Sequence, residues 1–272
     1  MKRGWLLGAL CLGTSMSFSA FERMPYGVDL AGLAGAGTAR PMVWGVFGNP
    51  AGAAGIRVRT LSLLHSPEPF GLRELERSAL VFAEPAFTGC FVVGLSRFGF
   101  DLYREVTASI SYAHRFSDQL DAGIAVTYYR LSIGSYGAAS TVGVDMGVQW
   151  TMCPGLRGGF TATNVNAPTI GATGEKLPQL LSGGIAYEPL EGISVVLDVF
   201  KDLHFPLETR FGVEYRLVDE LTLRAGVARD PAFFCAGLGF SVRPVIIDYA
   251  FQHHIELGFV HHIGVTIALS GW

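Results

Sequence analysis

Four histidines lie close together near the end of the 272-residue chain, in the stretch QHHIELGFVHH. If the flanking segments are strands joined by a loop of Glu256, Leu257 and Gly258, alternation places His253 and His261 on one outward face as cross-strand neighbours. Two imidazoles so placed could bind zinc or copper, with Glu256 as a third donor. We favour a different interpretation, a polar crown at the strand ends, and therefore expect no metal ion and no other cofactor.

A glycine- and alanine-rich stretch over residues 32 to 55, GLAGAGTARPMVWGVFGNPAGAAG, is the second candidate for chemistry. Glycine lets the backbone approach another group closely, so this stretch could cradle a phosphate or pack inside a cavity. A phosphate loop also needs a Gly-Lys-Ser/Thr ending after a strand, and the sequence lacks both. Elsewhere, His65, His114 and His204 have no serine or acid in a compelling catalytic pattern, so we expect no catalytic residue and no enzyme.

The composition indicates a membrane protein, with 50% hydrophobic and only 16% charged residues. Residues 1–19 place Lys2 and Arg3 before an apolar stretch and small residues after it, which predicts a secretory signal peptide. Beyond it, no apolar run reaches the roughly 18 to 20 residues of a spanning helix. A closed barrel is the remaining way to pair every backbone group within a bilayer. The net charge of −3 argues against a nucleic-acid partner.

From residue 56 onward, segments of membrane-spanning length alternate apolar with small or polar residues, which predicts a transmembrane antiparallel β-barrel. We expect about fourteen strands, at 56–65, 74–84, 87–98, 103–116, 119–133, 139–152, 155–166, 178–189, 192–201, 206–217, 220–229, 232–243, 245–254 and 260–270. Short turns such as Val218-Asp219 alternate with longer connections. This asymmetry predicts short turns, and both barrel ends, on the periplasmic side.

Side-chain parity assigns the two faces of the predicted barrel. The outward face collects apolar residues, as in Val142, Val144 and Met146. The opposite face collects charges, which would each cost several kcal/mol in lipid and are therefore expected in the lumen. The lumen residues that we single out are Arg115, Asp121, Asp145, Arg157, Asp198, Glu214, Arg216, Arg224 and Asp248. Acids and bases are balanced in this set, which favours a plugged or narrow lumen over an ion-selective pore.

The residues before the first strand complete the predicted domain organisation. Residues 20–55 are expected to form a periplasmic hatch, a plug folded into the lumen, and residues 56–272 the barrel, since a lumen of about fourteen strands has room for a folded segment. Asn49-Pro50-Ala51-Gly52 is the motif-like element of this segment. Proline fixes φ and the asparagine amide can cap nearby backbone, so a rigid turn is expected there.

The signal peptide, GAGTA followed by NPAG, and the closing DYAFQHHIELGFVHHIGVTIAL together resemble the FadL/PorV class of outer-membrane barrels. This resemblance implies a fourteen-stranded barrel whose N-terminal hatch carries an Asn-Pro-Ala element, here Asn49, Pro50 and Ala51. It also implies Sec-type export to the outer membrane of a Gram-negative bacterium, with membrane lipid around the barrel.

The resemblance leaves two functions open. FadL-like members imply passive passage of small hydrophobic molecules, and PorV-like members imply an adaptor or structural part of a type IX-like secretion or envelope complex. Four loop aromatics could line a ligand entry or dock a partner protein: Phe70, Phe205, Phe233 and Phe234. A continuous apolar path into the barrel would favour passage, and a sealed lumen would favour partnership.

Overall fold

The computed structural model describes residues 20–21, 26–202 and 205–269. The expected signal peptide, residues 1–19, lies outside the described residues. Within the described part, none of the helices is both long and apolar enough to cross a membrane.

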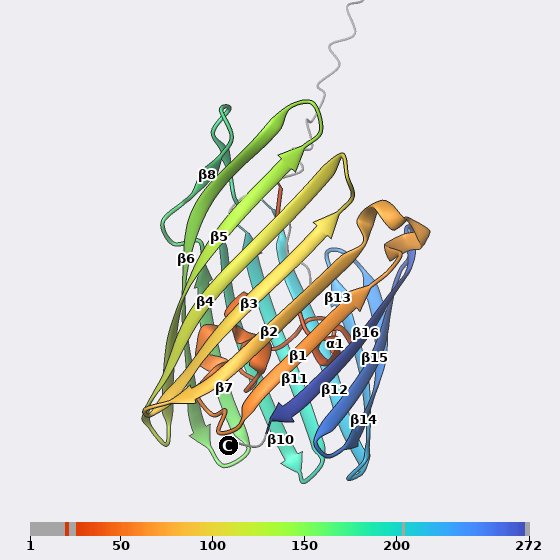
Figure 1. Ribbon diagram of the computed structural model, residues 1–272. Helices are drawn as coiled ribbons and strands as arrows, with labels where there is room; N and C mark the ends of the chain where they lie inside the picture. The colour runs from red at the N-terminus through yellow and green to blue at the C-terminus, as the bar shows by residue number, and fades with distance from the viewer. Residues whose placement is uncertain (1–19, 22–25, 203–204, 270–272) are drawn as a thin grey trace, which may run out of the picture.

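In the part of the chain that the structure describes, fourteen antiparallel strands close into a barrel, and β1 pairs with β16 to complete it (Figure 1). The barrel strands are β1 (Arg59–Ser66), β2 (Arg77–Ala86), β3 (Gly89–Gly99), β4 (Tyr103–Ser117), β5 (Leu120–Ile133), β6 (Gly137–Cys153), β7 (Leu156–Thr163), β10 (Leu180–Leu190), β11 (Ile193–Asp202), β12 (Leu207–Val218), β13 (Leu221–Arg229), β14 (Phe233–Val242), β15 (Val245–His254) and β16 (Gly258–Leu269). The predicted fold class is therefore confirmed.

The two ends of the barrel have different connections. At the lower end in Figure 1, the turn end, two-residue turns join the strands, as Phe87-Thr88 do between β2 and β3. At the opposite loop end, η3 (Pro69–Gly71) and η4 (Arg73–Leu75) connect β1 to β2. The loop between β7 and β10 contains a small hairpin, β8 (Thr169–Ile170) and β9 (Glu175–Lys176), which the sequence pattern does not predict.

The strands alternate between the two faces of the barrel with a period of two, as pleated strands must. On β15, Ile247 and Tyr249 point outward and are 51% and 39% exposed, whereas Asp248 and Ala250 point inward and are 7% and 0% exposed. Apolar residues therefore cover the outer face, as a bilayer requires, and polar and small residues line the inside.

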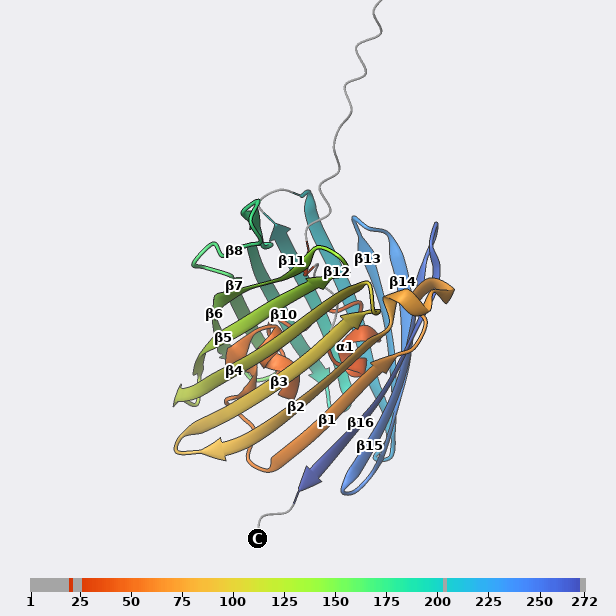
Figure 2. The same cartoon turned by 45° about the horizontal axis from the view of Figure 1, so that its top comes forward.

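The N-terminal part of the chain lies inside the barrel, where Figures 1 and 2 show its short helices enclosed by the strands. We call residues 26–55 the inner segment; it contains α1 (Val28–Ala31), η1 (Val43–Phe47) and η2 (Pro50–Ala53). Helix α1 packs against β14, β15 and β16, while η1 and η2 pack against strands β2 to β6. An apolar cluster that includes Trp44 and Val81 joins the inner segment to the wall.

The outward face can be tested with a charge placed at two heights on one strand. Leu238 lies mid-strand on β14 and faces outward, and Val242 ends that strand at the turn end. We expect Leu238→Arg to lower the free energy of unfolding in lipid vesicles by about 2–4 kcal/mol, and Val242→Arg by about 0–1 kcal/mol, because the cost depends on depth. Urea unfolding followed by the shift in gel mobility between unboiled and boiled protein measures both. Equal costs would contradict the outward-face assignment.

Candidate functional site

Glycines in the barrel wall allow the inner segment to approach the strands closely. A Cβ atom on Gly123 of β5 would lie 2.6 Å from the carbonyl carbon of Pro50, and one on Gly147 of β6 would overlap Asn49 Oδ1. Such contacts leave no room for a side chain, so the wall glycines and the inner segment fit each other.

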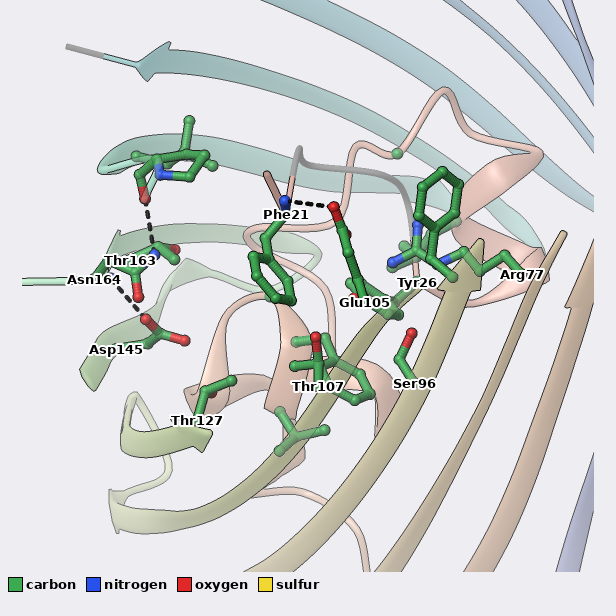
Figure 3. A pocket seen from close by; sticks show the side chains of 18 of the residues that line it. Phe21, Tyr26, Arg77, Ser96, Glu105, Thr107, Thr127, Asp145, Thr163 and Asn164 are labelled. Atoms are coloured by element: carbon green, nitrogen blue, oxygen red, sulfur yellow. Dashed lines mark hydrogen bonds between the residues drawn. The ribbon is translucent and has the colours of Figure 1, made fainter. Parts of the chain in front are cut away.

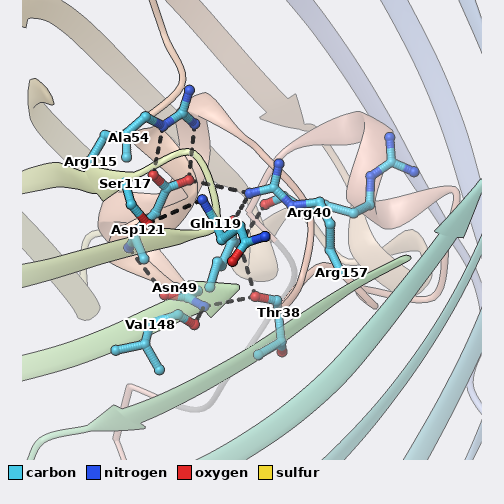
Figure 4. A network of polar contacts seen from close by, with 12 residues as sticks. Thr38, Arg40, Asn49, Ala54, Arg115, Ser117, Gln119, Asp121, Val148 and Arg157 are labelled. Carbon is cyan, nitrogen blue, oxygen red and sulfur yellow. Dashed lines mark hydrogen bonds and ion pairs between the residues drawn. The ribbon is translucent and has the colours of Figure 1, made fainter. Parts of the chain in front are cut away.

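Asn49 fastens the turn before η2 to the barrel wall. Its Oδ1 accepts a hydrogen bond from Ala51 N at 3.1 Å, which caps η2. Its Nδ2 donates to the carbonyl oxygens of Thr38 at 2.7 Å and of Val148 on β6 at 3.1 Å (Figure 4). Asn49 is buried, and Pro50 occupies the first helical position, where a missing N–H costs nothing. Since Asn49 Nδ2 also lies 3.4 Å from the carbonyl oxygen of Phe160 on β7, the Asn-Pro-Ala element links two parts of the inner segment to two adjacent strands.

Two wall side chains hold the backbone around Thr38. Asp198 Oδ2 on β11 accepts hydrogen bonds from the backbone N–H groups of Gly37 and Thr38, both at 2.8 Å, and from Thr38 Oγ1 at 2.7 Å. Gln149 Nε2 on β6 donates to the carbonyl oxygens of Thr38 at 3.0 Å and Arg40 at 2.8 Å. These bonds satisfy backbone groups that are buried and would otherwise destabilise the fold.

The charges that we expected in the lumen form two separate networks. In the first, Asp121 accepts from Arg115 Nε at 2.8 Å and from Arg157 Nη2 at 3.3 Å, and Arg157 also donates to Gln149 (Figure 4). Through Gln149 this network reaches the inner segment.

The second network joins Arg40 of the inner segment to strands β12, β13 and β15. Glu214 accepts from Arg40 at 2.8 Å and from Arg224 at 2.6 Å, and Arg224 also pairs with Asp248 at 2.6 Å. All four side chains are mostly buried. Positive and negative charges thus neutralise each other inside the barrel, as a buried network requires.

Besides Asp198, two of the expected lumen residues lie apart from these networks. Asp145 on β6 is buried nearer the loop end of the barrel, where its Oδ1 accepts a hydrogen bond from Asn164 N at 2.7 Å. Arg216 points to the inner side by parity, but it lies at the turn end, 47% exposed and 3.6 Å from Glu191. Its placement in the lumen was wrong, because parity fixes the face of a strand residue and not its height.

A cavity of about 500 Å³ lies between the inner segment and the loop end (Figure 3). Aromatic rings and hydroxyl groups both line it, the hydroxyls coming from neighbouring strands. The polar lining residues include Ser96, Thr107, Thr127, Thr161 and Thr163. The inner segment forms its floor, with Val46, Phe47 and Asn49 among the lining residues. This mixture suits a small, largely apolar molecule that carries few polar groups.

Three of the four loop aromatics that we singled out lie beside the histidine hairpin, but they do not share one face of the wall. Phe70 lines the cavity, with its ring 5.1 Å from that of His254. Phe233 is buried, and its ring lies 4.7 Å from that of His254. Phe234 is exposed on the outer face beside His253, and Phe205 is exposed at the loop end. Of the four, only Phe70 is positioned to touch a molecule in the cavity.

The histidine hairpin differs from our expectation by one residue. Gly258, with φ of 95°, is already paired with His254, so the turn is formed by residues 255–257. His253 therefore faces Phe259, and His261 faces Phe251 and bonds to the hydroxyl of Tyr249 at 2.8 Å. The prediction that His253 and His261 are direct cross-strand neighbours was wrong. In the described residues, no group of three or more His, Cys, Asp or Glu side chains is placed to hold a metal ion.

The sequence analysis missed Arg77, the first residue of β2, which lines the cavity and is only 5% exposed. A signal for it existed, because Arg77 has the same parity as the inward-facing Ala79 and Val81. It also missed Tyr26 and Glu105, since nothing in the sequence indicates which interior residues border empty space.

Comparisons with known proteins give the same fold. No family model and no curated protein matches the sequence. Solved structures do match: the "CymD monoaromatic hydrocarbon channel" has a TM-score of 0.67 at 14% identity, covering 91% of this chain and 98% of that chain. The toluene transporter TodX of P. putida has a TM-score of 0.69 at 12% identity, covering 91% and 99%.

A FadL homologue from Pseudomonas aeruginosa also matches, with a TM-score of 0.60 at 14% identity, covering 89% of this chain and 98% of that chain. The structure therefore has the same barrel fold as these FadL-like proteins, and the chain spans nearly the full length of their structures. At such low sequence identity, the structural likeness establishes the fold alone.

The close fit between wall and inner segment predicts that one methyl group is not tolerated at Gly147. We expect Gly147→Ala to displace the Asn49 turn and to lower the free energy of unfolding by about 1–3 kcal/mol, as overpacking does. Gly183→Ala on β10 is the matched control, since a Cβ there meets no atom within 4 Å. Urea unfolding in vesicles compares the two variants. Equal stability would show that the inner segment does not rest against β6.

Proposed function

We propose that this protein is an outer-membrane channel of a Gram-negative bacterium for small hydrophobic molecules. The observation that carries the proposal is the cavity of about 500 Å³ at the loop end, lined by aromatic rings and closed below by the inner segment. Such a chamber can take a small apolar molecule out of water, which a lumen filled by side chains could not.

The comparisons support this proposal. CymD is described as a monoaromatic hydrocarbon channel and TodX as a toluene transporter, and both share this chain's barrel over nearly their whole length. We therefore take monoaromatic hydrocarbons as the first molecules to test. The adaptor role in a secretion or envelope complex stays a prediction.

The floor of the cavity sets a condition for passage. The inner segment is bonded to the wall at β6 and β7, through the side chain of Asn49, and at β11, through the side chain of Asp198. A molecule in the cavity reaches the turn end only if this segment shifts, or it leaves through the wall. In our proposal the inner segment acts as a hatch and moves to let the molecule pass.

A disulfide between the inner segment and the wall tests whether this motion is needed. The backbone N of Ala34 donates to Sγ of the native Cys235 on β14 at 3.0 Å, so Ala34→Cys places two thiols side by side. We expect oxidation to reduce uptake of radiolabelled toluene to the level of cells without the protein, and reduction to restore it. The host is a Gram-negative strain without a hydrocarbon channel of its own, and Cys153→Ser removes the exposed thiol.

The control is Ala34→Ser, which cannot form the bond and should be insensitive to oxidant. Undiminished uptake by the fully cross-linked protein would exclude movement of this part of the hatch. Uptake by the unmodified protein no greater than that of cells without it would contradict the channel itself.

A further inference from the structure

Arg77 stands out among the inward-facing arginines of the barrel because no acidic residue in the described part of the chain pairs with it. Arg115, Arg157, Arg210 and Arg224 each donate to a carboxylate. Among the residues that the structure describes, none forms an ion pair or side-chain hydrogen bond with Arg77, and its buried Nε has no partner. A buried guanidinium without a counter-charge is costly, so a site that retains one is suited to receive an anion.

The surroundings of Arg77 fix where that anion would bind. The guanidinium carbon lies 3.9 Å from the centroid of the Tyr26 ring, which in turn stacks on Phe47 at 4.2 Å. Tyr26 thus covers one face of the guanidinium by a cation–π contact. Since Arg77 also lines the cavity, its planar edge with paired N–H donors is available to a carboxylate there, a geometry suited to a bidentate bond.

The two acids that line the same cavity are already occupied. Glu105 Oε1 accepts from Phe21 N at 3.0 Å and from the hydroxyl of Tyr103 at 2.7 Å. Asp145 accepts from Asn164 N and lies on the opposite side of the cavity from Arg77 (Figure 3). Each carboxylate therefore accepts from a donor of the protein, whereas the guanidinium of Arg77 has no side-chain acceptor among the described residues.

The cavity also restricts the body of the molecule. Rings of Phe21, Tyr26, Phe98, Tyr103 and Tyr129 line it, and the inner segment closes it below. An aromatic ring can stack on such side chains, whereas an alkyl chain gains no stacking contact from them.

We propose that the cavity binds compact aromatic monocarboxylates, with the carboxylate paired to Arg77 and the ring held among the aromatic side chains. This inference rests on the proposed function, since it names an additional class of molecule for the same cavity. It adds aromatic carboxylic acids to the hydrocarbons that we propose for the channel.

The test uses p-toluate, its neutral isostere p-toluamide, and laurate, each titrated calorimetrically into the purified full-length protein in a non-ionic detergent. We expect p-toluate to bind more tightly than p-toluamide or laurate. Arg77→Gln should weaken p-toluate binding by about tenfold to a hundredfold, the range for a hydrogen bond to a charged group, and leave p-toluamide binding unchanged.

Arg97→Gln is the matched control, because Arg97 pairs with Ser78 in the adjacent position of the β2–β3 ladder but its side chain is exposed on the outer face. It should bind p-toluate as the unmodified protein does. Equal affinity for p-toluate and p-toluamide in the unmodified protein overturns the proposal, and this comparison needs no variant that might fail to fold. Equal weakening by both arginine variants, or laurate binding as tight as p-toluate binding, overturns it as well.

Toluene uptake separates this inference from the proposed function. If the protein takes up toluene but does not bind p-toluate, the inference is wrong and the channel stands. If toluene uptake is absent, the proposed function fails, whatever the result for p-toluate.

Discussion

The buried backbone of the inner segment is the constraint on which the rest of the structure depends. Residues 34 to 40 lie inside the barrel without forming a regular helix or joining the sheet, so their N–H and C=O groups need other partners. The wall supplies them: Asp198 binds two N–H groups, Gln149 binds two carbonyls, and Arg210 donates to the carbonyl of Ala34 at 3.1 Å. The barrel and its contents therefore form one hydrogen-bonded unit.

This constraint accounts for the composition of the inward face. Glycines stand where the inner segment touches the wall, and charged residues stand where its polar groups need partners or where they pair with one another. The balance of acids and bases reflects these pairings, as in Arg224 with Glu214 and Asp248. Between the inner segment and the loop end, no inner-segment backbone needs partners from the wall. There the lining changes to aromatic rings and hydroxyl groups around a cavity. The position of the cavity follows from where the inner segment stops.

Much of the barrel could be predicted from the sequence because strand pairing is a local, periodic signal. Each two-residue turn ends one run of alternation and begins the next, so the number of strands, their order and their faces follow. The height of a residue along the barrel axis and the register of a turn carry no such signal. Arg216 has inward parity yet lies at the exposed end of β12, and the left-handed Gly258 begins β16 rather than ending the turn, which separates His253 from His261.

The cavity could not be predicted, because it depends on how far the inner segment fills the barrel. Arg77 and Tyr26 meet across 51 positions of sequence (77 − 26), and no alternation pattern relates them. The sequence predicts a turn at Asn49, but the bond of Asn49 to the Val148 carbonyl of β6 depends on the fold of the whole segment. Interior contacts between a segment and a wall therefore require the structure.

Hydrogen exchange of the full-length protein in lipid vesicles tests the central claim most directly, that the inner segment is a folded floor bonded to the wall. The account predicts that the amides of Gly37, Thr38 and Ala51 exchange as slowly as those of the barrel strands, because each is buried and hydrogen-bonded to a side chain. Exchange as fast as in the exposed loop 67–76 would show that the segment is not held, and would contradict the account.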